Sequence, residues 1–288
     1  MSDEARPRAT VVVPASSGDP ALGAVVASCL AQSEPRLEVL VVHDGPSAVP
    51  RELDGIDDAR VVALALPGLG AGARANVGIA LARGASVKIL LGGDAEMPPG
   101  CIEQELAALD AHPDCAAVVA LAAERPSLLA ELLEGRAPRV AAASFRADAL
   151  RSLGGLDAAL THALGYDLWL RLAPRHPVHA LAAATSAATG GPEGPGDGGV
   201  ASRVEHGCVL VRAICEHGLD WWCGATSCDA RAAWTELALR LLRSGFPEVL
   251  PLVRMSGRRA RAMGHALPPL EELERLAAER TALPTSLP

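Results

Sequence analysis

The sequence has very few aromatic residues, and its basic charge comes almost wholly from arginine. Aromatic side chains make up 2% of the 288 residues, whereas 50% of the residues are hydrophobic, so the core must be built from Ala, Val and Leu. Lys88 is the only lysine, and the formal net charge is −8. Because a phosphate backbone is bound by clustered positive charge, this balance argues against a nucleic-acid partner.

Long apolar runs and paired cysteine motifs are also missing. No stretch of about 18 uncharged apolar residues occurs, and the first ten residues hold acids where a leader segment would be apolar. We therefore expect a soluble, cytoplasmic protein with no transmembrane segment. The seven cysteines form no CxxC pair, which predicts reduced thiols in place of a disulfide framework or a zinc site.

Strand-like and helix-like segments alternate through the first two thirds of the sequence. Short β-branched or apolar runs, closed by Gly, Pro or Asp turns, alternate with stretches of helix-forming residues. The predicted strands are residues 10–13, 37–42, 60–66, 87–91, 116–122 and 141–145. The predicted helices are residues 21–32, 74–83, 101–111, 128–134, 147–153 and 166–172. This alternation predicts an α/β fold with a mostly parallel sheet and ligand loops along one edge.

A stretch rich in Gly and Pro separates this part from the rest of the chain. Residues 190–199, GGPEGPGDGG, cannot pack a core and predict a flexible loop or linker. The helical patterns that follow are residues 202–217, 230–244 and 270–282. The sequence therefore predicts a first domain over residues 1–189 and an α-helical C-terminal region over residues 200–288.

Three of the four tryptophans fall in this C-terminal region. Trp221, Trp222 and Trp234 supply large apolar surfaces, which a small separate bundle of helices would struggle to bury. We therefore expect the C-terminal helices to pack on the first domain.

An apolar strand that ends in carboxylates marks one candidate ligand site. The strand at residues 87–91 stops at a Gly-Gly-Asp-Ala-Glu turn, so Asp94 and Glu96 follow its carboxyl end. Open α/β sheets bind their ligands at that end, and glycines let a ligand approach the backbone. Carboxylate oxygens suit Mg²⁺ or Mn²⁺. Asp94 and Glu96 therefore predict a divalent-metal site, with solvated loop acids as the simpler alternative.

Other polar residues follow neighbouring strands or open the helices after them. Asp44 follows the second strand, Ser16 follows the first, and Arg74 and Asn76 lie near the start of a helix. Together they favour a nucleotide site at the carboxyl edge of the sheet. Singly, each has a plainer explanation, because an Asp after a strand often caps a turn and a helix arginine is usually only solvated.

A series of motifs occurs in order between residues 9 and 182. The motifs are VVVPASSGDP at residues 11–20, LEVLVVHDGPS at 37–47, GLGAGARANVGIALARG at 68–84, GGD at 92–94, FRADALRSLGGLD at 145–157 and GYDLWLRL at 165–172. In this order and with these gaps, the series resembles the family 2 glycosyltransferases. The resemblance implies the GT-A fold.

The resemblance also implies an activity and a set of site residues. Such an enzyme moves a sugar from a nucleotide-diphosphate sugar to an acceptor hydroxyl, with inversion at the sugar and with help from Mn²⁺ or Mg²⁺. The positions that it assigns to nucleotide-sugar binding are Pro14, Ser16, Asp44, Arg74, Asn76, Gly93 and Asp94. It assigns metal binding to Asp94, with Glu96 as a second ligand. The acceptor stays unidentified.

The chain departs from the family pattern at positions that carry chemistry. His43 stands in the first of two base-reading acidic positions, and Gly92 replaces the first acid of the DxD motif, which should weaken the metal site. Leu164 and Gly165 occupy the places of the acidic pair that supplies the general base. Asp167 is the nearest surviving acid and becomes the candidate catalytic residue. Two residues along a helix turn a side chain by about 200°, so Asp167 faces another way.

Two other functions stay open at this point. The lost acids favour, as an alternative, a catalytically silent GT-A domain that binds nucleotide or a protein partner. The segment at residues 70–75 follows a strand and resembles part of a dinucleotide-binding fingerprint, which would indicate an oxidoreductase. That fingerprint belongs on the first strand of its domain, whereas two predicted strands precede it here.

Overall fold

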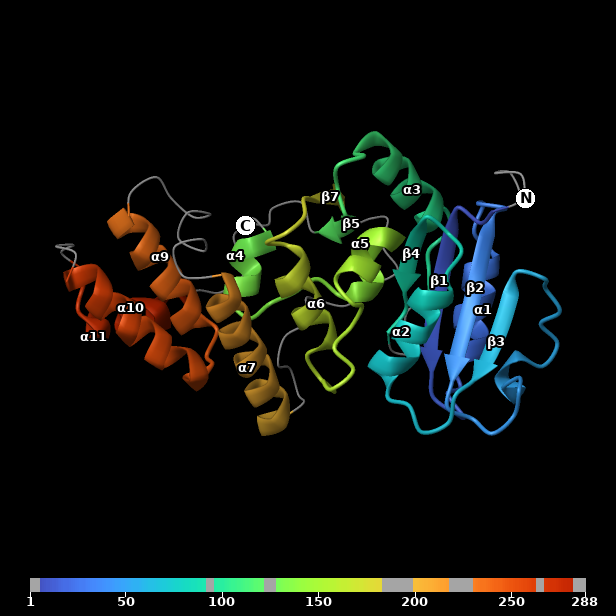
Figure 1. Cartoon of the computed structure of the whole chain (residues 1–288), viewed down its shortest axis with the longest axis horizontal. Coiled ribbons are helices and arrows are strands. Elements are labelled where there is room, and N and C mark those ends of the chain that lie inside the picture. The colour runs from blue at the N-terminus through green and yellow to red at the C-terminus, as the bar shows by residue number, and fades with distance from the viewer. Residues whose placement is uncertain are drawn as a thin grey trace.

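A seven-stranded sheet and a group of C-terminal helices occupy the two ends of the molecule, with helices α4 (Leu128–Leu133) and α6 (Leu164–Leu172) between them (Figure 1). The computed structural model describes residues 6–91, 96–121, 128–182, 199–217, 230–262 and 267–281. Within these residues, no helix is both long enough and apolar enough to cross a bilayer.

The sheet is parallel except at one strand. Its order is β3-β2-β1-β4-β6-β5-β7, and β6 runs antiparallel to both β4 and β5. The strands are β1 Ala9–Ala15, β2 Leu37–His43, β3 Val61–Ala65, β4 Ser86–Ile89, β5 Ala117–Leu121, β6 Ala143–Arg146 and β7 Val178–Ala182. The predicted α/β fold with a mostly parallel, mixed sheet is therefore confirmed.

Helices cover both faces of the sheet. Besides α4 and α6, the helices of this part are α1 Leu22–Leu30, α2 Ala71–Leu81, α3 Cys101–Ala111 and α5 Ala147–Ser152. Helices α1 and α3 share one apolar cluster with β1 and β2, and helices α2 and α5 contribute to a second cluster on the other face. All residues of β1 and β2 are buried, which explains why nearly all of them are apolar, with Thr10, Glu38 and His43 as the exceptions.

Helix α2 lies unusually close to β1. A Cβ on Gly78 would stand 2.3 Å from Cγ1 of Val12, so only glycine allows this approach. The close packing holds the first turn of α2, which carries Arg74, at a set position relative to the carboxyl end of β1.

The only lysine is buried in the centre of the sheet. Nζ of Lys88 forms a 2.6 Å ion pair with Glu105, and the hydroxyl of Ser144 donates to the second carboxylate oxygen at 2.6 Å. A buried charge is tolerated only with such partners. This group ties β4, β6 and α3 together just before residues 92–95.

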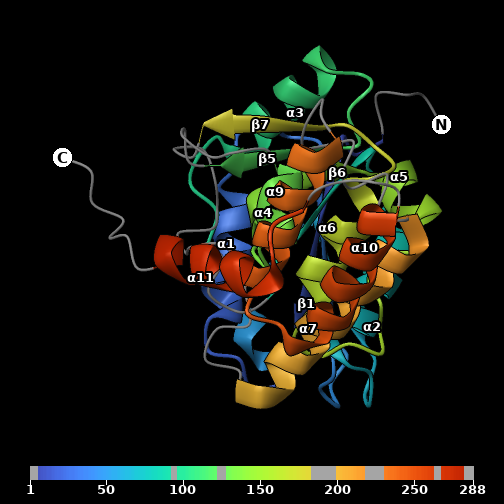
Figure 2. The same ribbon diagram turned by 90° about the vertical axis from the view of Figure 1, so that its left-hand side faces the viewer.

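The C-terminal helices share a core with the first part of the chain. They are α7 Gly199–His217, α9 Ala230–Arg243, α10 Leu250–Ala262 and α11 Leu270–Thr281, and they lie in front of the sheet in Figure 2. Trp169 on α6 belongs to the same buried cluster as Leu210 on α7 and Trp234 on α9. Trp221 and Trp222 lie outside the described residues. The expected packing of this region on the first domain agrees with that shared cluster.

Strand β7 and helix α10 were not predicted from the sequence. Of the expected linker, residues 190–199, the described residues include only Gly199. Strand β7 has no alternating pattern of its own and is defined by its parallel pairing with β5. Helix α10 contains Pro251 and Gly257, and the latter lies against the indole of Trp234. Residues 190–198 lie outside the described residues, whereas Gly199 already begins α7. The division at residues 189 and 200 stays a prediction.

Candidate functional site

Three of the residues predicted to bind the nucleotide sugar form one hydrogen-bonded group at the carboxyl edge of β1 and β2. This group, called the donor group, consists of Ser16, Asp44 and Arg74. Arg74 donates from Nη1 to Oδ2 of Asp44 at 3.0 Å and from Nη2 to Oγ of Ser16 at 3.3 Å. The other carboxylate oxygen of Asp44 accepts the backbone N–H of Ser17 at 2.6 Å. The side chain of Asp44 remains 31% exposed, so a ligand can reach this group.

Arg74 is the buried member of that group. Its side chain is 5% exposed, and Nη1 also donates to the carbonyl of Leu69 at 2.5 Å. Its Nε atom is buried and has no hydrogen-bond partner within the described part of the chain. A guanidinium fixed in this way presents a permanent positive charge at the edge of the sheet.

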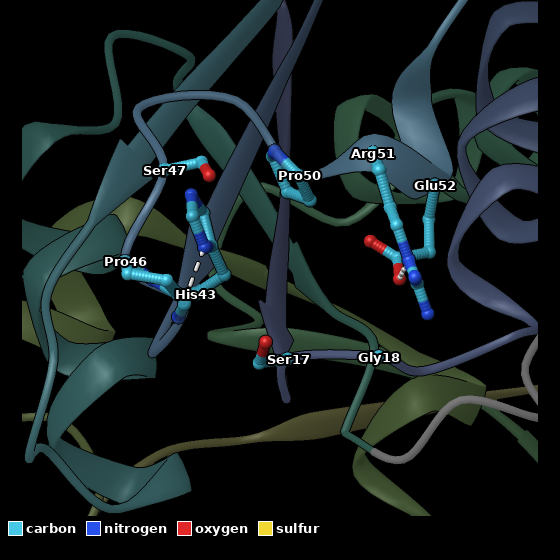
Figure 3. Close-up of a pocket in the computed structure, with 9 residues that line it drawn as sticks. Ser17, Gly18, His43, Pro46, Ser47, Pro50, Arg51 and Glu52 are labelled. Carbon is cyan, nitrogen blue, oxygen red and sulfur yellow. Dashed lines mark hydrogen bonds and ion pairs between the residues drawn. The ribbon is translucent and has the colours of Figure 1, made fainter.

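A pocket of about 250 Å³ lies beside the group and is shown in Figure 3. It is formed by the loop after β1 and by the segment from the end of β2 to the short helix η2 (Arg51–Leu53). The lining residues are Ser17, Gly18, His43, Gly45, Pro46, Ser47, Pro50, Arg51 and Glu52. Ligand pockets usually measure roughly 300–1,000 Å³, so this one has room for part of a nucleotide sugar.

His43 shapes the wall of this pocket. Its ring is 1% exposed, and Nδ1 accepts the backbone N–H of Gly45 at 3.2 Å. Nε2 lies 3.4 Å from the carbonyl of Ala48, so the neutral ring that suits both partners carries its proton on Nε2. His43 therefore holds the loop after β2 in place.

Asn76 does not join the donor group. Its Nδ2 donates to the carbonyl of Leu156 at 2.8 Å, and its Oδ1 accepts the N–H of the same residue at 2.8 Å. Gly155 approaches so closely that a Cβ there would lie 2.3 Å from Oδ1. Both ends of the amide are engaged, so Asn76 ties α2 to the loop after α5, and its predicted role in nucleotide binding stays a prediction.

The remaining residues predicted to bind the nucleotide sugar or the metal are Pro14, Gly93, Asp94 and Glu96. Pro14 is buried within β1, opposite Val42 on β2. Gly93 and Asp94 lie outside the described residues, and Glu96, just after them, is exposed. Within the described ranges, no three His, Cys, Asp or Glu side chains gather as a metal site. One or two carboxylates suffice for Mg²⁺ when phosphates complete the shell, so Glu96 fits a weak, ligand-assisted site.

Asp167 is held between two arginines. The carboxylate is 1% exposed, and Oδ2 pairs with Nη2 of Arg171 at 2.6 Å, while Oδ1 pairs with Arg212 on α7. Arg171 also donates to the carbonyls of Leu153 and Gly155 at 2.9 and 2.8 Å. Both carboxylate oxygens are occupied, which favours a structural role over the predicted role as general base.

The positions of the missing acidic pair are apolar contacts. Leu164 and Gly165 are both buried in the first turn of α6. A Cβ on Gly72 would lie 2.8 Å from Cδ2 of Leu164, so the leucine packs on the first turn of α2. An apolar helix contact therefore stands where the family resemblance places a base.

A carboxylate from α7 lies next to this turn and was missed by the sequence reasoning. Glu205 accepts the backbone N–H groups of Thr161, His162 and Ala163 at 2.9, 2.5 and 2.8 Å. Burial raises the pKa of Glu205, but the three N–H donors lower it by more, so its pKa lies below the usual value. These donors lie in the loop before α6, so Glu205 fixes that loop from another element. No local sequence pattern signals such a contact.

The contact between α6 and α7 predicts a pH-dependent stability. The His206 ring is buried 5.3 Å from that of Tyr166, and burial lowers its pKa, although a bond to the carbonyl of Ser202 opposes this. Because the pKa of His206 is lower in the folded chain, the unfolded chain binds more protons in this range. The contribution of neutral His206 to the free energy of unfolding is therefore complete above about pH 6.5 and is lost as pH falls through the folded pKa. We expect the melting temperature to fall between about pH 7.5 and 5.5. The melting temperature of His206→Gln should fall less over that interval. If a thermal-shift assay shows the same fall for the variant and the unmodified chain, His206 is not the cause.

Comparisons with known proteins agree with this geometry. Residues 10–138 match the model of glycosyl transferase family 2. The structure of TarS 1–349 from S. aureus is similar over 97% of this chain and 93% of that chain, with 13% identity and a TM-score of 0.52. The mannosyltransferase PcManGT from Pyrobaculum calidifontis, in complex with GDP-Man and Mn²⁺, is similar over 96% of this chain and 80% of that chain, with 20% identity and a TM-score of 0.56.

A further structure of TarS 1–349, in complex with UDP-GlcNAc, covers 95% of this chain and 91% of that chain at 14% identity and a TM-score of 0.50. No curated protein sequence matches the chain. At these identities the structural likeness concerns the fold, while the family match includes the segments that carry Ser16, Asp44 and Arg74. Residues 10–138 are therefore similar to glycosyl transferase family 2, and the chain has the GT-A fold.

Proposed function

We propose that this chain transfers a sugar, with inversion, from a nucleotide-diphosphate sugar to an acceptor hydroxyl. The observation that carries the proposal is the group of Ser16, Asp44 and Arg74 at the carboxyl edge of β1 and β2, beside a pocket. The GDP-Man of PcManGT and the UDP-GlcNAc of TarS support a nucleotide sugar as the class of donor.

The nucleoside end of the donor fits the pocket beside Asp44. Pro46 and Pro50 supply apolar surface for a base, and Ser17 and Ser47 supply hydroxyl groups. The exposed carboxylate of Asp44 has lone pairs left to accept hydrogen bonds from a base N–H or a ribose hydroxyl. Since Ser17 and Arg74 hold this carboxylate from two sides, it is in position before the ligand arrives.

The diphosphate end requires positive charge, because it leaves as an anion. Arg74 supplies a fixed guanidinium at the same edge, and its planar donors suit phosphate oxygens. A divalent ion, Mn²⁺ or Mg²⁺, would be held by Glu96 and by Asp94 and would neutralise leaving-group charge when bound. The Mn²⁺ in PcManGT supports this choice of ion.

Inverting transfer also requires a group that accepts the proton of the acceptor hydroxyl. General-base help is typically worth about 10²–10⁴ in rate. Asp167, the candidate from the sequence, has both oxygens in ion pairs, which supports a role in fixing the loop after α5 through Arg171. We therefore propose that transfer is slow or needs an activated acceptor.

Asp44→Ala tests the donor site. Because a hydrogen bond to a charged group is worth about 1.5–3 kcal/mol, the variant should bind its donor at least about tenfold more weakly. Calorimetry with a panel of UDP-, GDP- and TDP-sugars, with and without Mn²⁺, measures the affinity. Asp54→Ala, which removes an exposed acid just after η2, is the matched control and should bind normally.

Two results would contradict the proposal. One is the absence of binding to the unmodified chain by every sugar nucleotide of the panel at millimolar concentration. The other is an unchanged affinity in Asp44→Ala. Binding without transfer or hydrolysis of any donor would instead identify a silent GT-A domain.

A further inference from the structure

A second pocket lies at the opposite edge of the sheet, where β1 and β4 begin. Its volume is about 690 Å³, and β1 and β2 run away from this edge toward the donor site (Figure 1). The lining arginines are Arg6, Arg8, Arg36, Arg83, Arg146 and Arg151. Five separate segments of the chain contribute to this set: the N-terminal segment, the residue before β2, the turn after α2, the end of β6, and α5. In a chain with a net charge of −8, this concentration of arginine is exceptional.

Carboxylates balance only part of this charge. Arg8 pairs with Glu34 and Asp110 at 3.3 and 2.5 Å, and Arg83 pairs with Glu38 at 2.5 Å. The Arg83 side chain is nevertheless 61% exposed. These three carboxylates and Asp148, which lines the pocket, face six guanidinium groups, so positive charge remains in excess.

Two of the arginines have a structural explanation. Arg146 donates to backbone carbonyls at and beyond the end of α3, and Arg151 donates to carbonyls at the end of α2. The C-terminal end of a helix carries only about half a negative charge, so these contacts leave most of each positive charge uncompensated.

Two further lining arginines, Arg6 and Arg36, neither cap a helix nor form a close ion pair. Arg6 is exposed and has no side-chain partner among the described residues, and Arg36 is exposed with its Nε 3.8 Å from Glu34. The carboxylate near Arg36, that of Glu34, is buried but also pairs with Arg8, so neither Arg6 nor Arg36 is the sole partner of a buried group. Both stand at a pocket whose volume falls within the roughly 300–1,000 Å³ typical of ligand sites.

We propose that this basic pocket, defined by its six arginines, binds a small soluble anion with two or more adjacent phosphate groups. Guanidinium groups bind phosphate oxygens in pairs of parallel hydrogen bonds, and several of them around one hollow suit a multiply charged ligand. The concave shape favours a small anion over the flat surface of an anionic bilayer. The site is separate from the donor site, because the sheet's strands run between the two edges.

Binding of sodium tripolyphosphate to the full chain, measured by calorimetry without divalent ions, tests the proposal. The double variant Arg6→Gln/Arg36→Gln should bind about tenfold more weakly, because it removes two charges from the pocket while the buried Glu34 keeps its ion pair with Arg8. Arg254→Gln/Arg258→Gln removes two exposed arginines from α10 and should leave the affinity within about twofold. Asp44→Ala should also bind tripolyphosphate normally, which separates this pocket from the donor site.

Several outcomes would overturn the proposal. They are no binding by the unmodified chain at millimolar tripolyphosphate, equal weakening in both arginine pairs, and loss of binding in Asp44→Ala. Capture of the chain by vesicles of anionic phospholipid, sensitive to Arg6 and Arg36 but without tripolyphosphate binding, would assign the surface to a membrane and also overturn it. The single variant Arg6→Gln provides the same comparison, with a smaller expected loss, should the double variant fold poorly.

Discussion

Asp167→Asn is expected to lower the free energy of unfolding by about 3 kcal/mol, because it removes the charge from a buried carboxylate that pairs with two arginines. The amide cannot replace the ion pairs with Arg171 and Arg212. Arg171 also donates to the carbonyls of Leu153 and Gly155, so the loop after α5 should loosen as well. Chemical denaturation of the full chain measures the change.

Asp157→Asn is the matched control, because it pairs with the same Arg212 but its side chain is 29% exposed. The Arg212 hydrogen bond holds the pKa of Asp157 below its usual value, against the effect of burial. An exposed ion pair is worth about 0–1 kcal/mol, so this variant should lose far less stability. If Asp167→Asn abolishes sugar transfer while keeping its full stability, Asp167 acts as a base and the structural role is wrong.

Phe246→Ala is expected to lower the free energy of unfolding by about 3–5 kcal/mol, in line with other buried phenylalanines. Phe246 is 2% exposed and precedes the short helix η5 (Pro247–Val249) in the C-terminal region. Its ring lies against Gly135, where a Cβ would stand 2.9 Å from Cε2. Because Gly135 follows α4, the contact joins the C-terminal helices to the first part of the chain.

The chain has only one other phenylalanine, Phe145 on β6, and it is fully buried beside Trp169. Phe145→Ala should therefore shift the same single unfolding transition by a similar amount, provided that the two regions share one core. Met255→Ala, at an exposed position of α10, should shift it little. Two separate transitions in calorimetry, each sensitive to one phenylalanine, would show that the C-terminal region folds independently.

The sequence by itself determined the order of strands β1–β6 and helices α1–α6 and the edge of the sheet at which the donor group forms. Each of these depends on short-range patterns: apolar runs end at turns, and the carboxyl ends of parallel strands meet at one edge. Ser16 and Asp44 follow adjacent strands, so parallel pairing alone brings them together. Arg74 joins them because Gly78 lets α2 approach β1.

Only the tertiary structure decided which polar side chains remain available for a ligand. Asn76 and Leu156 are 80 residues apart, and Arg212 and Asp167 are 45 apart, yet these contacts engage side chains that sequence motifs assign to ligands or catalysis. Strand β7 and the hydrogen bonds from Glu205 to the loop before α6 likewise depend on partners elsewhere in the chain. Hydrogen-bond partners of this kind are set by how the elements pack, and local periodicity carries no record of them.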